Sequence, residues 1–265
     1  MQLFGIFNEE YGIIVMVITM KIIRKLLLII CILCAIGAAI IMYPMHTAIP
    51  GIATPYILDV ISTARNTYDE MYRQKLLDAY NVHYNKNNDF QGIIAFESNI
   101  ISERVMQAED NDKYLRRDFN LKRDIEGTVF MDADCTLDSK NITMYGHYVY
   151  YNTKAKFSPL HLLVKEMNYE KNKYITFQLK DQVRRYEVFA VYYYDWENEA
   201  GFFYNTPDFQ TGEGFQRLIT NSRKRSFYKI DVDVEDDDNI LTLQTCVRNR
   251  DDLRLIVVAK EIERK

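Results

Sequence analysis

The sequence is poor in the residues that mark several classes of protein. It has 10 glycines and 5 prolines in 265 residues, which excludes collagen-like and low-complexity chains. Its 4 cysteines are too few for a disulfide framework in a chain of this length. Basic residues are not in excess, because 33 Lys and Arg stand against 37 Asp and Glu, for a formal net charge of -4. A protein that binds nucleic acid through phosphate contacts is usually basic, so nucleic acid is not expected as a partner.

The chain does contain ample apolar material for a folded core. Hydrophobic residues make up 48% of it and aromatic residues 13%, with 20 Tyr and 14 Phe. Aromatic side chains crowd residues 145–228, and such enrichment favours strands. The length favours one or two domains.

An uncharged apolar run covers residues 26–43. Its 18 residues would span roughly 27 Å as a helix, close to the thickness of the hydrocarbon core of a bilayer. Lys21, Arg24 and Lys25 precede the run, and the next basic residue is Arg65. The positive-inside rule then places the N-terminus in the cytoplasm and the remainder outside the cell. We expect a single-pass signal anchor in the cell membrane; a cleaved signal peptide and a buried core helix are the alternatives.

The rest of the chain is expected to form one extracellular domain. The expected segments are a cytoplasmic N-terminus over 1–25, the transmembrane anchor over 26–43, a linker over 44–54 and the domain over 55–265. Thr54 and Pro55 suit the N-cap and first position of a helix. Apolar residues recur at helical spacing up to Met71 and again from Leu76. This pattern predicts two amphipathic helices between about 55 and 84, packed on the main domain.

Beyond about residue 88 the apolar pattern changes to that of strands. Eight short β-like runs, separated by turn residues, cover 92–96, 127–131, 141–149, 173–179, 185–194, 227–234, 240–246 and 254–262. So many short strands favour a closed barrel or a sandwich over 88–262. One helix is expected near 212–222, where Phe215, Leu218 and Ile219 share a face. The fold class is therefore mainly β with added helices.

Three residues at the ends of β-like runs carry groups suited to acyl transfer. His147 lies in the motif Tyr-Gly-His, Cys246 ends the run 240–246, and Arg254 begins the next run. A cysteine and an arginine on successive strands bring thiol and guanidinium together across the sheet. In acyl transfer a thiolate attacks a carbonyl, an imidazole handles the proton of the leaving amine, and a fixed cation stabilises the oxyanion.

Several motifs together resemble the class B sortases, the membrane-anchored cysteine transpeptidases that attach surface proteins to the cell wall of Gram-positive bacteria. In chain order the matching segments are Asn88 to Ile94, Asp110 to Phe119, Gly127 to Asp132, Ser139 to His147, and Thr242 to Cys246 with Arg254. The helix near 212–222 is similar to the long insertion between late strands in that class, and 55–84 fits the N-terminal helices of the family. The resemblance implies an eight-stranded sortase-like β-barrel.

The same resemblance implies a role for each matched residue. His147 matches the general acid/base, Cys246 the nucleophile, and Arg254 the arginine that holds the substrate and stabilises the oxyanion. Gln244, Thr245 and Tyr148 are expected to bind substrate. Gln244 stands where the family commonly has Ser, Tyr148 where it has Asn, and Val247 where a polar residue often follows the cysteine. These departures leave the preferred sorting signal open, but not the reaction.

The implied activity cleaves a C-terminal sorting signal of surface proteins through a Cys thioester and transfers the protein to a peptidoglycan precursor amine. No cofactor is expected. Polymerisation of pilus subunits and plain hydrolysis are alternatives within the enzyme class. A non-catalytic, membrane-tethered domain that binds peptides is the alternative outside it.

The residues themselves leave other interpretations open. Cys246 is compatible with a buried strand cysteine or a disulfide with Cys135, and Arg254 with an ion pair to Asp251 or Asp252. His147 is compatible with a structural role, and His46, His83 and His161 lack catalytic context and are expected to be structural or exposed.

No metal site is expected. An EF-hand loop from Asp231 would need Gly at the sixth position and Glu at the twelfth, but Asp236 and Thr242 stand there. The acidic run over 231–238 is expected to be a solvated turn, with a weak calcium site as the alternative.

Overall fold

The structure, a computed structural model, describes residues 53–198 and 201–265. The predicted membrane span over 26–43, with 1–25 and most of the linker, lies outside these residues. Within the described residues, no helix combines the length and apolar character needed to cross a bilayer. Asp69–Lys265 form a compact unit that holds every described strand, and a second unit ends at Tyr68.

Helix α2, Ala53–Tyr84, is one continuous helix of 32 residues. The expectation of two helices is therefore wrong. The stretch over 73–75, where the apolar pattern lapses, contains no Gly or Pro, and Arg, Gln and Lys are good helix formers. The lapse marks an exposed stretch of one helix. Its last turns pack on the strands that follow, as expected, because the Tyr80 phenol donates to the Phe90 carbonyl at 2.8 Å and the His83 and Phe90 rings lie 5.0 Å apart.

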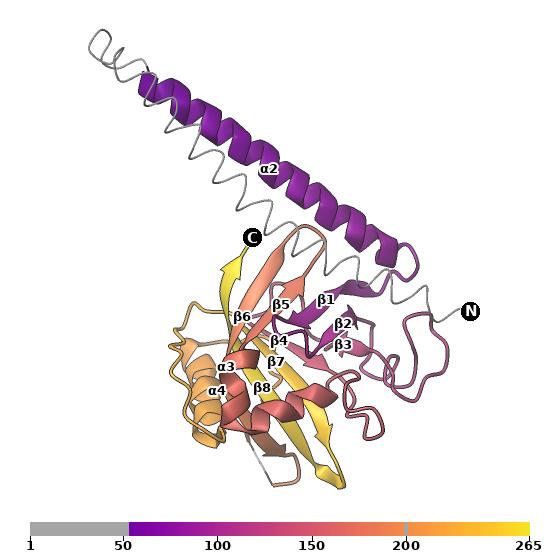
Figure 1. Ribbon diagram of the computed structural model, residues 1–265. Helices are drawn as coiled ribbons and strands as arrows, with labels where there is room; N and C mark the ends of the chain where they lie inside the picture. The colour runs from indigo at the N-terminus through magenta and orange to yellow at the C-terminus, as the bar shows by residue number, and fades with distance from the viewer. Residues whose placement is uncertain (1–52, 199–200) are drawn as a thin grey trace. The chain divides into compact units, whose positions relative to one another are not determined.

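Eight strands close into a barrel in the order β1-β2-β3-β4-β7-β8-β6-β5 (Figure 1). They are β1 Phe90–Phe96, β2 Ser102–Met106, β3 Val129–Met131, β4 Asn141–Tyr145, β5 Tyr174–Gln178, β6 Val183–Asp195, β7 Ile240–Val247 and β8 Arg250–Arg264. Neighbours pair antiparallel except β2 with β3 and β4 with β7, which are parallel. The eight-stranded barrel confirms the predicted fold class.

The structure contains one strand that was not predicted and lacks one that was. Ser102–Met106 forms β2, although its Ser, Glu and Arg gave no apolar run. The run 227–234 forms no strand, although its burial alternates as in a strand. It lies beside β6, where the Phe227 amide donates to the Val191 carbonyl at 2.8 Å. The pairing of β5 with β6 ends at Glu187, so this side of β6 is open beside Val191, but a single main-chain hydrogen bond there does not make a ladder.

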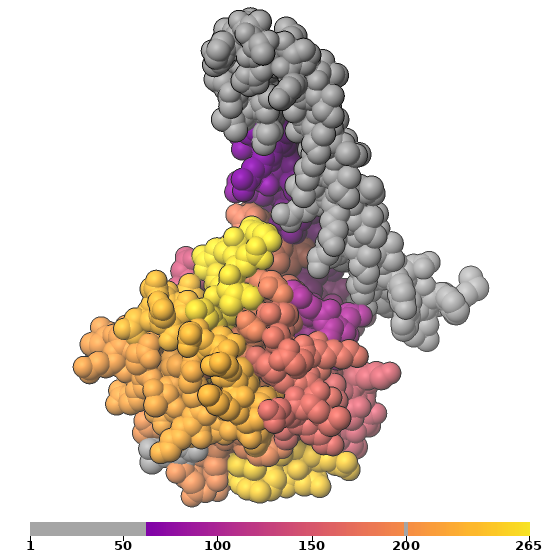
Figure 2. All heavy atoms as spheres, turned by 60° about the vertical axis from the view of Figure 1, so that its left-hand side comes forward, coloured from indigo at the N-terminus to yellow at the C-terminus, as the bar shows by residue number. Residues whose placement is uncertain are grey.

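Side chains alternate between the barrel interior and its outer face. On β7, Leu241 and Leu243 belong to the main core, whereas Ile240 packs in a second cluster with helix α4. Helix α4, Gly212–Arg225, begins at the N-cap Thr211 and buries the apolar face predicted from the sequence. Figure 2 shows the orange segment that carries this helix on one side of the barrel unit.

Short helices connect β4 to β5. They are the 3-10 helices η1 Ser158–Val164 and η2 Glu166–Asn168, and helix α3 Tyr169–Asn172. Pro159 stands in the first turn of η1, and Ser158, Leu160 and Leu163 are buried. This burial fixes η1 against the barrel.

Candidate active site

The parallel pair β4 and β7 brings two candidate residues to neighbouring strand ends. Its register runs from Asn141 opposite Ile240 to Tyr145 opposite Gln244. The Gly146 amide extends the pairing by donating to the Gln244 carbonyl at 3.1 Å. His147 follows the end of β4 and Cys246 lies near the end of β7, each two residues beyond the last register pair of the two strands.

Cys246 and Arg254 lie directly opposite each other in the antiparallel pair β7 and β8. Directly opposed side chains project from the same face of a sheet, with their Cβ atoms about 5 Å apart. The thiol and the guanidinium therefore share the outer face of the barrel.

Thr245 has the opposite orientation. Its side chain is fully buried, whereas Gln244 and Cys246 on either side of it are partly exposed. Alternation along β7 turns Thr245 inward, as it does Leu243. The side chain of Thr245 thus lies behind the surface that carries the thiol.

The ring of His147 is held by a main-chain contact. Its Nε2 lies 2.8 Å from the carbonyl oxygen of Leu115. Because a carbonyl oxygen only accepts, this contact assigns the ring hydrogen of the neutral imidazole to Nε2 and leaves Nδ1 as the acceptor nitrogen. Leu115 belongs to the motif over 110–119, which the sequence marked without a role for it.

Arg254 is held by main-chain carbonyls of the β7–β8 hairpin. Its Nη1 donates to the carbonyl of Asp251 at 2.7 Å and to that of Leu253 at 2.9 Å. The carboxylate of Asp252 instead pairs with Arg250 at 2.5 Å. These contacts differ from the alternative in which Arg254 is an ion-pair partner of one of the two carboxylates.

Cys135 and Cys246 are both free, so the alternative disulfide between them is absent. Cys135 is buried, and burial raises the pKa of its thiol to about 11. Its Sγ lies 3.4 Å from the carbonyl of Asn141, and the Thr143 amide donates to it. Cys246 is partly exposed, which makes it the thiol of the two that a peptide reaches.

Cys246 lines a surface hollow of about 310 Å³. The other lining residues are Tyr148, Tyr150, Val247, Arg248 and Asn249. Tyr148 thus lies beside the thiol, and its ring packs at a tilt against that of His161, with centroids 4.7 Å apart.

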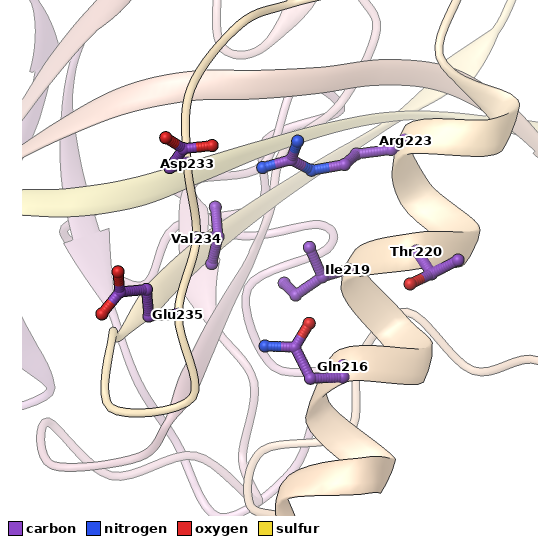
Figure 3. Close-up of a pocket in the computed structure, with 7 residues that line it drawn as sticks. All are labelled: Gln216, Ile219, Thr220, Arg223, Asp233, Val234 and Glu235. Atoms are coloured by element: carbon purple, nitrogen blue, oxygen red, sulfur yellow. The ribbon is translucent and has the colours of Figure 1, made fainter.

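A second hollow, of about 380 Å³, lies between α4 and the segment that precedes β7 (Figure 3). Its lining residues are Gln216, Ile219, Thr220, Arg223, Asp233, Val234 and Glu235. This lining contains no cysteine or histidine and offers no group for acyl transfer.

The segment between β6 and α4 reaches the site through Tyr204. The phenol of Tyr204 donates to Oε1 of Gln244 at 2.6 Å. Burial raises the pKa of Tyr204, and the charge of Arg254 opposes that rise. Tyr204 therefore lies within electrostatic range of Arg254. Nothing in the sequence distinguished it from its many aromatic neighbours.

His161 also escaped sequence reasoning, which set it aside as structural or exposed. Its Nε2 lies 3.0 Å from the main-chain carbonyl of Cys246. Burial lowers the pKa of His161, and the Cys246 carbonyl acts in the other direction.

The acidic run over 231–238 ends in a hydrogen-bonded turn. The Glu235 amide donates to the Asp238 carboxylate at 2.7 Å, and Lys260 pairs with the same carboxylate at 2.7 Å. In the described part of the chain, no group of three or more His, Cys, Asp or Glu side chains is placed to hold a metal ion.

Comparison with known proteins identifies the family. The sortase domain model matches residues 100–262. The chain belongs to the sortase family. It is 31% identical over 181 residues to sortase B of Staphylococcus aureus, covering 67% of this chain and 72% of that protein. It is 27% identical over 173 residues to sortase B of Listeria monocytogenes, covering 62% and 65%.

Solved sortase structures share the barrel. The X-ray structure of Clostridium perfringens sortase B has a TM-score of 0.63 and 31% identity, covering 68% of this sortase and 98% of that chain. The Staphylococcus aureus sortase B–substrate complex has a TM-score of 0.65 and 26% identity, covering 76% and 98%. These similarities confirm a class B sortase with the sortase B fold and the activity of a cysteine transpeptidase.

Proposed function

We propose that this sortase cleaves a C-terminal sorting signal of surface proteins through a thioester on Cys246 and transfers them to a peptidoglycan precursor amine. The observation that carries this proposal is the partly exposed thiol of Cys246, which lies opposite Arg254 on β8 and near the end of the strand beside the one that leads to His147. The three groups match the requirements of acyl transfer: nucleophile, proton carrier and fixed cation.

In the first half-reaction, the thiolate of Cys246 attacks the Thr carbonyl of the sorting pentapeptide. The C–N bond of the scissile amide breaks, and His147, as imidazolium, gives the proton on Nδ1 to the departing amine. The Leu115 carbonyl orients the ring by its contact with Nε2. Arg254 donates hydrogen bonds to the oxyanion, with a planar two-donor geometry that Lys lacks.

In the second half-reaction, an amino group of the peptidoglycan precursor attacks the thioester. His147 accepts its proton, the new amide forms, and the thiolate of Cys246 leaves. Proton transfer therefore runs through His147 in both directions.

The peptide is bound along the hollow beside Cys246. Tyr148 lines that hollow, and Gln244 lies two residues before the thiol on the same face of β7. Thr245 supports this surface from behind, through its packing inside the barrel. The sorting-signal preference follows Tyr148 and Gln244, the positions that depart from the family pattern.

The enzyme is held in the cell membrane by residues 26–43, with the N-terminus inside and the catalytic domain outside. This assignment rests on the apolar run and its basic flank. It predicts that the full chain pellets with membranes and needs detergent for release. A chain that starts after residue 43 stays in the soluble fraction, and a soluble full chain would contradict the anchor.

Intact-mass analysis with a library of sorting peptides tests the chemistry. The wild-type enzyme should gain the mass of an acyl fragment, and peptide mapping should place the adduct on Cys246. Cys246→Ala should form no adduct and lose turnover, whereas the matched control Cys135→Ala should keep both. An added amine should shift the product from free acid to amide. Full turnover by Cys246→Ala would refute the mechanism, and binding without adduct would favour the peptide-binding domain.

A further inference from the structure

The pairing between β4 and β7 stops just before the nucleophile. The Gly146 amide donates to the Gln244 carbonyl, and carbonyls two residues apart on a strand point the same way. The carbonyl of Cys246 therefore faces the β4 side, where a continued parallel ladder would supply the amide of Tyr148. The chain has left β7 at that point, because Tyr148 instead forms a bridge with Lys156.

The imidazole of His161 occupies the position of the missing strand partner. Its Nε2 lies 3.0 Å from the Cys246 carbonyl oxygen, and since a carbonyl only accepts, Nε2–H is the donor. Burial lowers the pKa of His161, which favours the neutral ring with its single N–H.

The donor comes from a fixed segment. His161 lies on η1, which is anchored by four buried residues, and the Ser158 hydroxyl accepts from the Val149 amide at 2.7 Å. The other side of the ring contacts Tyr148, which lines the hollow of the thiol. One side chain thus contacts both the main chain of Cys246 and a wall of the proposed peptide site.

We propose that His161 is a positioning residue for the nucleophile: it holds the Cys246 main chain where β4 has separated from β7, so that the site is open and yet rigid. The proposal rests on the assignment of Cys246 as nucleophile. The pairing on the other side of β7 is irregular at the same place, because the register with β8 shifts between Cys246 and Val247. Without His161, the thiol would be carried by a strand end that is weakly held on both sides.

Two substitutions test the hydrogen-bond donor and the aromatic ring of His161 one at a time. His161→Phe keeps a ring against Tyr148 but has no donor, whereas His161→Gln keeps a side-chain N–H near the position of Nε2 but has no ring. A displacement of the nucleophile of about 1 Å costs on the order of 100-fold in rate. We expect kcat to fall about 10- to 100-fold in His161→Phe and to stay within about 3-fold of wild type in His161→Gln.

The experiment measures kcat and KM with a cleaved sorting peptide, per folded enzyme counted by Cys246 alkylation after complete reaction. The rate of that alkylation gives a second readout, and it should fall in His161→Phe and be rescued in His161→Gln. His83→Phe is the matched control, because His83 is a partly buried histidine that contacts Arg104 and Phe90. Its kcat should equal that of the wild type.

The outcomes are distinct. Wild-type kcat and alkylation rate in His161→Phe would overturn the positioning role, as would equal losses in the Phe and Gln variants. Activity retained by Cys246→Ala would instead overturn the proposed function. If His161→Phe folds poorly, the comparison with His161→Gln still tests the positioning role. A purely structural role predicts that the folded fractions of the two variants have the same kcat.

Discussion

Neighbouring residues of β7 have different environments because their side chains alternate. Thr245 is buried in the barrel, while Cys246 is partly exposed beside the hollow. A thiol on the inner face would resemble Cys135, whose pKa burial raises to about 11. The position of the cysteine in the alternation therefore decides whether it is available for chemistry.

Thiol labelling checks this difference between Cys135 and Cys246. With iodoacetamide at pH 8, Cys246 should be alkylated and Cys135 should not, because the buried thiol stays protonated and covered. Peptide mapping by mass spectrometry measures both sites. Unfolding in guanidinium should expose Cys135 to the reagent. Labelling of Cys135 at the rate of Cys246 in the native protein would contradict the burial.

The substitution Arg254→Lys tests whether the planar guanidinium, with its two donors, is needed at this position. We expect kcat to fall by about 100-fold, because removing an oxyanion donor typically costs 10²- to 10³-fold. The fold should be unchanged, since Arg254 contacts only main-chain carbonyls of its own hairpin among the hydrogen bonds described. Steady-state kinetics and thermal unfolding measure the two effects. An unchanged kcat would remove Arg254 from the proposed mechanism.

Sequence reasoning located side chains with distinctive chemistry but not the groups that hold them. Cys246 and Arg254 were visible because they stand at the junction of two successive strands. The Leu115 carbonyl was invisible, because every residue has a carbonyl. The contact of His161 with Cys246 joins residues 85 positions apart, and no local pattern reports such a distance.

At the scale of elements, the apolar strands of the barrel were predictable from the sequence. Segments whose strand formation depends on pairing with neighbours were not. The run 185–194 is rich in apolar and aromatic residues, and its burial alternates over 185–188 before it becomes continuous. Ser102–Met106 became a strand because β1 and β3 flank it, although its composition is polar. The run 227–234 has a strand-like burial pattern and lies beside β6, but it is joined to β6 by one main-chain hydrogen bond and forms no ladder. The local sequence thus indicates which side chains are buried, whereas the arrangement of neighbouring strands determines which segments form ladder hydrogen bonds.

The turn that carries His147 is closely packed. A Cβ added to Gly146 would lie 2.6 Å from the ring of Phe157, which is fully buried. Gly146→Ala should therefore lower the free energy of unfolding by about 1–3 kcal/mol and also lower kcat, because overpacking would shift the strand end before His147.

Urea unfolding and steady-state kinetics measure these two effects. Gly212→Ala is the control, since its Cβ would meet only the flexible carboxylate end of Asp236, at 3.2 Å. The control should change stability by less than about 0.5 kcal/mol, the usual range for surface positions. Equal stability of the two variants would show that Phe157 yields to the added methyl.

The stability of the whole molecule should depend on the protonation of His161. Burial lowers its pKa in the folded state, while in the unfolded chain it titrates near about 6.5. Below that pH the unfolded chain binds a proton that the native protein does not, so this residue makes the free energy of unfolding fall as pH falls. The groups that face the ring are the Tyr148 side chain and the Cys246 carbonyl.

Urea unfolding at pH 7.5 and pH 5.5 measures this dependence. From pH 7.5 to pH 5.5, the free energy of unfolding of the wild type should fall more than that of His161→Gln, because glutamine does not titrate in this range. If the two proteins differed in free energy of unfolding by the same amount at both pH values, the lowered pKa of His161 would be contradicted.

The parallel pairing of β4 with β7 also constrains how the enzyme is made. His147 and Cys246 are 99 residues apart in the chain, and the pairing of their strands closes a loop that contains β5, β6 and α4. Contacts of such high sequence separation form late and slowly in folding. A chain in which β4 and β7 have not yet paired therefore holds His147 and Cys246 apart. Under the proposed function, activity would therefore begin only once these two strands have paired.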